Sequence, residues 1–183
     1  MLLGSCSVGH GDGEVDGVVS IDGCRREGPY QLRPTVFFAE TVEQVLKIRI
    51  QRGSDIEVYS DGIGVLVDDA ALVRRAYLGQ AIEVAAPLDG PAERDVPHVD
   101  VTLFLNESCP AERTRTPVTL SAVSGTIRFA AIYAPKVDKD DVRIAAELEN
   151  VRFEDPRVDD RWAVLNGRFD FLYVRGSPAQ RFP

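Results

Sequence analysis

The sequence predicts an all-β domain, an antiparallel β-sandwich of about nine or ten strands with one short helix. The first observation is a set of three long C-terminal segments in which apolar and polar residues alternate, residues 124–135, 141–153 and 162–174. Successive side chains of a strand point to opposite faces, so a period of two is typical of strands with one buried face. The second observation is the recurrence of turn signals about every 8–12 residues, a spacing typical of sandwiches and barrels.

These three segments are expected to form an antiparallel meander that carries much of the core. The side chains predicted to be buried there are Phe129, Ile144, Phe169 and Phe171. The middle segment changes phase after Leu148, and its apolar alternation resumes at Val151. An extra residue near Glu149 and Asn150, a β-bulge, would restore the alternation.

Shorter strands are predicted upstream of the meander. Residues 18–22, 35–40 and 45–51 have β character, and Leu46, Ile48 and Ile50 share one face of the last of these. Asp61-Gly62 separates two further β segments, and this dipeptide suits the positive φ angles of a tight hairpin turn. Strands are also expected at residues 81–87 and 98–106.

One helix is predicted over residues 68–79. Asp68 or Asp69 can cap its first free amides, and Gly79 supplies a left-handed stop. The helix is short, so we expect it to depend on packing against a sheet.

The N-terminus is predicted to lie outside the domain. Residues 1–17 are interpreted as a lipobox-like start followed by a flexible tether that contains Gly9, Gly11, Gly13 and Gly17, and residues 18–183 as a single β-sandwich domain. Leu3-Gly4-Ser5 would precede a lipid-accepting Cys6, although a positively charged n-region is missing and the h-region is only Leu2 and Leu3. The alternative is an ordinary flexible start.

The other two cysteines, Cys24 and Cys109, form an even pair if Cys6 carries lipid. Each lies in turn-like sequence that borders a strand, which suits a disulfide in an oxidising compartment. The alternative is two unpaired thiols in a cytosolic protein.

Composition and motifs argue against several function classes. The net charge is −8, and the basic residues form no cluster that could displace counterions from nucleic acid. No run of about 18 apolar residues occurs, so no membrane-spanning helix is predicted. His10 and His98 have no nucleophile at a recognisable spacing, so we predict no catalytic centre and no enzyme activity.

Three weaker site hypotheses remain open. Trp162 and Tyr59 are candidates for stacking on a sugar ring, as in a carbohydrate-binding module. Glu147 and Asp170 lie on neighbouring predicted strands and would be needed for a carboxylate-dependent hydrolase. The acidic turns (Asp138, Asp140, Asp141, Glu154, Asp155, Asp159 and Asp160) lack the spacing of a calcium loop, so neither a metal nor a cofactor is predicted.

The lipobox-like cysteine, the Gly-rich start and the strands "SGTIRF" and "LNGRFDF" together resemble small exported bacterial lipoproteins with a β-sandwich domain. The resemblance implies a cell-envelope protein, lipid-anchored at the outer membrane or periplasmic. Its expected role is that of a structural or protein-binding module, with a protein partner, or alternatively a glycan, in the envelope or at the cell surface.

Overall fold

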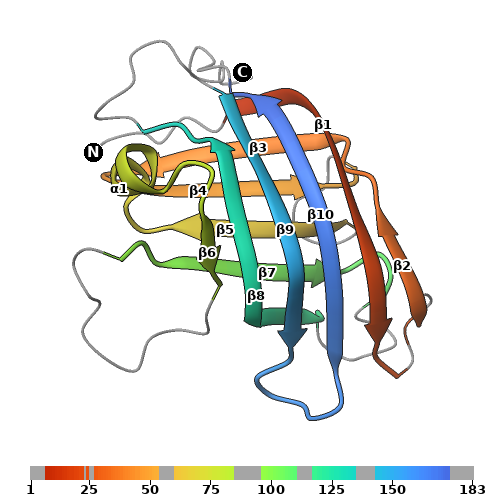
Figure 1. The fold of residues 1–183 in the computed structure, drawn as a ribbon. Helices are drawn as coiled ribbons and strands as arrows, with labels where there is room; N and C mark the ends of the chain where they lie inside the picture. The colour runs from red at the N-terminus through yellow and green to blue at the C-terminus, as the bar shows by residue number, and fades with distance from the viewer. Residues whose placement is uncertain are drawn as a thin grey trace.

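The computed structural model describes residues 7–22, 24, 27–53, 60–84, 96–110, 117–134 and 143–173, without the side chains of Ser7 and Val8. These ranges contain ten strands and one short helix (Figure 1). The strands are β1 (Ser7–Ser20), β2 (Gly28–Leu32), β3 (Val36–Val42), β4 (Val45–Gln51), β5 (Asp61–Val67), β6 (Ala81–Glu83), β7 (Val99–Leu105), β8 (Thr119–Ala131), β9 (Arg143–Glu154) and β10 (Trp162–Leu172). The helix is α1 (Ala70–Leu72), which continues as the π-helical turn η1 (Val73–Tyr77).

Eight of the strands form a closed antiparallel β-barrel, in the order β1, β3, β4, β5, β7, β8, β9 and β10. The ring closes because β1 pairs with β3 on one side and with β10 on the other. The prediction of a sandwich is therefore wrong, whereas the all-β class and the single short helix are confirmed. In Figure 1 the strands β8, β9 and β10 cross over β4, β5 and β7, which gives the barrel two crossing walls.

Two strands lie off the ring. β6 pairs with β8, and β2 pairs with the C-terminal half of β1, on the same side as β3. Pro34 lies between β2 and β3, and a proline cannot donate a backbone hydrogen bond to a ladder. β2 and β3 thus share one side of β1, separated by this break.

Buried side chains of the described strands pack together inside the barrel. The four predicted core residues Phe129, Ile144, Phe169 and Phe171 are buried, and they pack with inward-facing residues of every barrel strand. An eight-stranded barrel has an interior just wide enough for its side chains to fill. The predicted bulge is also confirmed: the ladder between β9 and β10 shifts where Glu149 and Asn150 oppose Asn166.

Strand β1 corrects the prediction of a flexible tether through Gly17. Its residues from His10 to Ser20 pair continuously with β10. On the face of β1 that includes the buried Val15 and Val19, the cross-strand pairs are Gly11 with Phe171, Gly13 with Phe169, Val15 with Gly167, Gly17 with Leu165 and Val19 with Ala163. In the first four pairs a glycine lies opposite a larger apolar residue. The alternating glycines therefore belong to the seam that closes the barrel.

Backbone contact explains the glycines of this seam. A Cβ atom on Gly17 would collide with the carbonyl oxygen of Val164 and with Leu165, and one on Gly11 would collide with Phe171. Gly13 is less crowded, since its nearest neighbour would be the carbonyl oxygen of Arg168 at 3.2 Å. Glycine at the tight positions allows β1 and β10 to approach closely while large side chains of β10 fill the interior.

The helix follows the prediction at both ends. The Asp69 carboxylate accepts a hydrogen bond from the amide of Leu72 at 2.8 Å, and Gly79 has a φ of +73°. Ala70 and Val73 are buried against the barrel, in line with the expected dependence on packing. The predicted hairpin turn at Asp61-Gly62 is wrong, because both residues lie within β5 and pair with β7.

We predict that Gly17→Ala destabilises the protein by about 1–3 kcal/mol, because the added methyl group overpacks the seam. Gly13→Ala is the matched control and is expected to cost less, since its new Cβ has more room. Urea unfolding measures both changes. Two variants as stable as the original chain would indicate that β1 is a tether after all.

Candidate functional site

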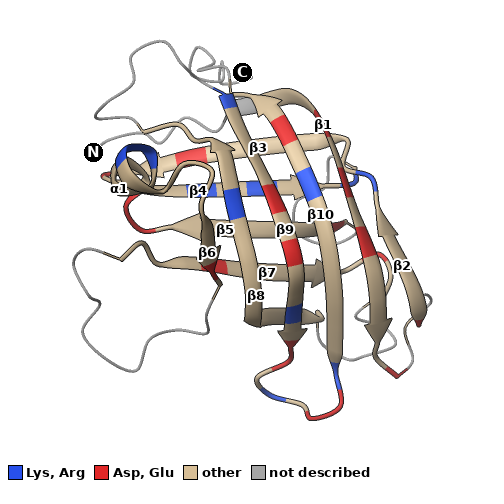
Figure 2. Cartoon of the chain, viewed as in Figure 1, with Lys and Arg blue, Asp and Glu red and all other residues tan. Residues whose placement is uncertain are grey.

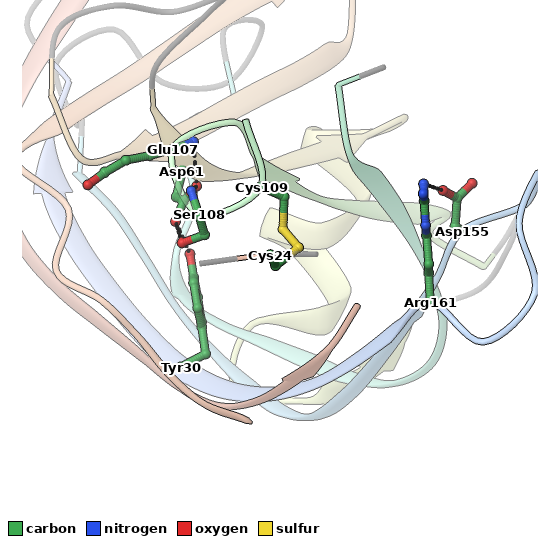
Figure 3. Close-up of a disulfide and its surroundings, with 8 residues drawn as sticks. All are labelled: Cys24, Tyr30, Asp61, Glu107, Ser108, Cys109, Asp155 and Arg161. Atoms are coloured by element: carbon green, nitrogen blue, oxygen red, sulfur yellow. Dashed lines mark hydrogen bonds and ion pairs between the residues drawn. A yellow bond between two sulfur atoms is a disulfide. The ribbon is translucent and has the colours of Figure 1, made fainter. Parts of the chain in front are cut away.

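The two predicted disulfide cysteines are joined. Cys24 follows β1, Cys109 follows β7, and a disulfide connects them (Figure 3). Cys109 is fully buried, and its amide donates to the carbonyl of Leu105 at 2.7 Å. Disulfides persist in oxidising compartments, so this bond points to an extracytoplasmic protein.

A buried carboxylate lies beside the disulfide. Asp61 has no solvent exposure, and its oxygens accept hydrogen bonds from the amides of Glu107 and Ser108, from the Ser108 hydroxyl and from the Tyr30 hydroxyl (Figure 3). The Arg52 guanidinium lies 3.5 Å from the same carboxylate, and its Nε donates a hydrogen bond to Glu107 at 2.9 Å. Burying a carboxyl group is costly unless its oxygens are hydrogen-bonded in this way. These bonds tie Asp61 of β5 to the turn after β7.

Trp162 lies in a surface hollow of about 390 Å³ with the β9–β10 turn. The Arg152 guanidinium lies 5.4 Å from the centre of the Trp162 ring, so it covers one ring face. Asp155, in the same hollow, accepts bonds from Arg157 and Arg161. Burial would raise the pKa of Asp155, but these bonds outweigh it and hold the pKa below its usual value. Tyr59, the other predicted stacking residue, lies outside the described residues.

Of the two acids considered for a hydrolase, Asp170 forms an ion pair with Arg143 on the outer face. Asp170 bonds Arg143 at 2.6 Å, and this bond lowers the pKa of Asp170. Glu147 lies opposite Arg168 in the register of β9 and β10. Figure 2 shows charges of both signs along β9 and β10.

In the described part of the chain, the two histidines lie at separate positions. His98 lies 3.1 Å from Asp100, and His10 is on the outer face of β1 opposite Leu172. In the ranges that the structure describes, no group of three or more His, Cys, Asp and Glu side chains could hold a metal ion. Asp138, Asp140 and Asp141 lie outside those ranges, as does the predicted lipid site Cys6. No helix of the described part has the length and apolar character to cross a membrane.

A different surface has the geometry of a binding site. A hollow of about 360 Å³ lies on the outside of the barrel, across β3, β4, β5 and β7. We call it the outer hollow. Its apolar part is made by the half-buried side chains Phe38, Leu66 and Phe104, and its polar part by Glu40, Lys47, Arg49, Asp100 and Thr102.

Glycine creates the depression in the outer hollow. Gly62 lies opposite Phe104 in the ladder of β5 and β7, and a Cβ on Gly64 would meet the Phe104 ring at 3.2 Å. The ring therefore lies across a stretch of β5 that has no side chains on this face. The Arg49 guanidinium stacks above the ring, 4.7 Å from its centre, in a cation–π contact.

The charges of the outer hollow are arranged by strand. Lys47 and Arg49 both point outward from β4, and Glu40 lies opposite Lys47 in the register of β3 and β4. Figure 2 shows these basic residues on β4 beside an acidic one on β3. Within the described ranges Lys47 forms no ion pair, whereas Arg33, Arg143 and Arg168 each have a carboxylate within 3.1 Å.

Sequence reasoning did not find the outer hollow. It placed Lys47 and Arg49 only on the strand face opposite Leu46, Ile48 and Ile50, and it gave no role to Phe104. The available signal was a large aromatic residue in the polar phase of its strand, together with two glycines spaced by two in β5.

Comparison with protein-family models, curated proteins and solved structures gives no match to this chain.

We predict that replacing Cys24 and Cys109 by alanine lowers the free energy of unfolding by roughly 3–5 kcal/mol, since the bond closes a long loop with a sequence separation of 85 residues. Urea unfolding of the double variant and of the original chain, with and without reductant, measures the loss. Reductant should destabilise only the original chain. A loss below about 1 kcal/mol would show that the bond adds little to the fold.

Proposed function

We propose that this protein is a non-enzymatic binding module that engages a protein partner through the outer hollow. The observation that carries the proposal is the composition of that hollow, an apolar floor of Phe38, Leu66 and Phe104 surrounded by polar and charged groups. Protein interfaces are typically built in this way, with a desolvated apolar centre rich in aromatic and arginine side chains and a polar rim.

The rigidity of the hollow, which has a volume of about 360 Å³, supports binding. The floor lies on four paired strands, so it is formed before binding, and little ordering cost is expected.

We further propose that the protein acts in the bacterial cell envelope, with Cys6 as its lipid-attachment site. The disulfide supports an oxidising compartment. Strand β1 begins at Ser7, directly after Cys6, so a lipid on Cys6 would hold the barrel close to the bilayer without a long spacer. The mass of the mature protein tests lipidation, and an unmodified Cys6 would contradict the anchor.

Selection from a phage-displayed library of random peptides tests the main proposal. We expect peptides that bind the original chain and lose at least about tenfold in affinity on Leu66→Asp, because the charge enters the apolar centre. Val18→Asp is the matched control, since Val18 is an exposed apolar residue on the outside of β1. Failure to obtain any peptide that distinguishes Leu66→Asp from the control would overturn the assignment of this surface.

A carbohydrate-binding role at Trp162 is the second candidate, favoured by the hollow in which Trp162 lies. Trp162 is the one tryptophan of the chain, so its fluorescence reports directly on that hollow. Titration with a panel of oligosaccharides should shift the emission if a sugar ring stacks there. An emission spectrum that stays unchanged across the panel would leave only the peptide-binding proposal.

A further inference from the structure

We infer that the outer hollow recognises a segment of its protein partner in which an apolar side chain adjoins a single carboxylate. The inference rests on the proposed function and names the chemistry of the partner. It follows from two features of the surface, the position of the apolar depression and the position of Lys47 next to it.

The apolar side chain fits against the Phe104 ring in the outer hollow. Gly64, beside this ring, presents only backbone to the outer face, and its neighbours across the ladders are Arg49 on β4 and Thr102 on β7. Phe104 covers one side of the depression at 3.2 Å from a Cβ position on Gly64, and Phe38 and Leu66 line the rest. An inserted aliphatic or aromatic group would remove its own apolar surface and theirs from water, which favours binding.

The carboxylate fits at Lys47. Lys47 lies opposite Leu66 in the register of β4 and β5, and it lines the outer hollow. Its side chain is exposed, and in the described part of the chain it forms no ion pair, so a partner's carboxylate displaces no internal partner there. The cation–π contact of Arg49 with Phe104 adds a second positive charge on the same strand.

The flanking acids limit the charge that the partner can carry. Glu40 lies beside Lys47 on β3, and Asp100 lies beside Leu66 on β7. Like charges placed opposite each other are destabilising. A segment of several consecutive acidic residues would meet these carboxylates, whereas one acid next to an apolar residue would meet Lys47. The surface therefore favours the mixed pair over a polyacidic segment.

Three blocked peptides test the inference: they share one Phe in a Ser-Gly background and carry Glu, Gln or Lys beside it. NMR titration of ¹⁵N-labelled protein gives the dissociation constants and reports the fold of each variant. We expect the original chain to bind the Glu peptide roughly two- to fivefold more tightly than the Gln peptide, as for an exposed ion pair. The Lys peptide should bind least well.

Lys47→Glu should reverse the order, so that the Lys peptide binds more tightly than the Glu peptide. Arg75→Glu is the matched control, because Arg75 is an exposed cation on η1 outside the outer hollow, and it should keep the original order. If the original chain, Lys47→Glu and Arg75→Glu all bind the peptides in the same order of affinity, the inference is overturned. The proposed function still stands in that case if Leu66→Asp weakens peptide binding. Peptide binding that Leu66→Asp leaves unchanged, or no binding at all, would overturn both.

Discussion

The seam between β1 and β10 is the constraint on which the rest of this structure depends. Here the barrel closes, and four successive inward pairs place a glycine opposite a larger apolar residue. Phe169 and Phe171 can fill the interior because Gly13 and Gly11 leave room for them across the ladder. Phe171 then stacks with Phe37 of β3, ring centres 5.3 Å apart, so the same aromatic side chain joins three strands of the barrel.

Closure determines which surfaces remain for function. With the interior filled, a ligand can meet the described part of the barrel on its outside or near its ends. Near one end, the disulfide and the Asp61 cluster hold the turn after β7 in place. The outer hollow has the same pairing of glycine and an aromatic residue as the seam, but on the outward face of the barrel. There Phe104 lies opposite Gly62 and next to Gly64. Glycine opposite an aromatic residue thus allows close packing at the seam and leaves a depression in the outer hollow.

The sequence predicted the features that depend on local pattern. Alternation located the long strands and their buried residues, the phase change at Leu148 located the bulge, and Asp69 and Gly79 bounded the helix. Closure of the barrel could not be predicted in this way, because the strands of a sandwich and of a barrel show the same alternation of apolar and polar residues. The glycines of β1 have no side chain and so no hydrophobic signal, and their partners lie some 150 residues away in β10. The outer hollow likewise exists only once β3, β4, β5 and β7 are neighbours. The dipeptide Asp61-Gly62 was mistaken for a turn because its local sequence is typical of one. The groups that hydrogen-bond to Asp61 belong to Tyr30 and Ser108, which are distant in sequence.

Amide hydrogen exchange of β1 in the native protein tests the closed barrel most directly. We expect amides of residues 10–20 that bond to β10 to exchange as slowly as those of β9 and β10, because opening the seam requires global unfolding. Rapid exchange throughout β1, with β9 and β10 still protected, would contradict it. That result would mean that residues 7–17 are a flexible tether and that β10 is an open edge strand.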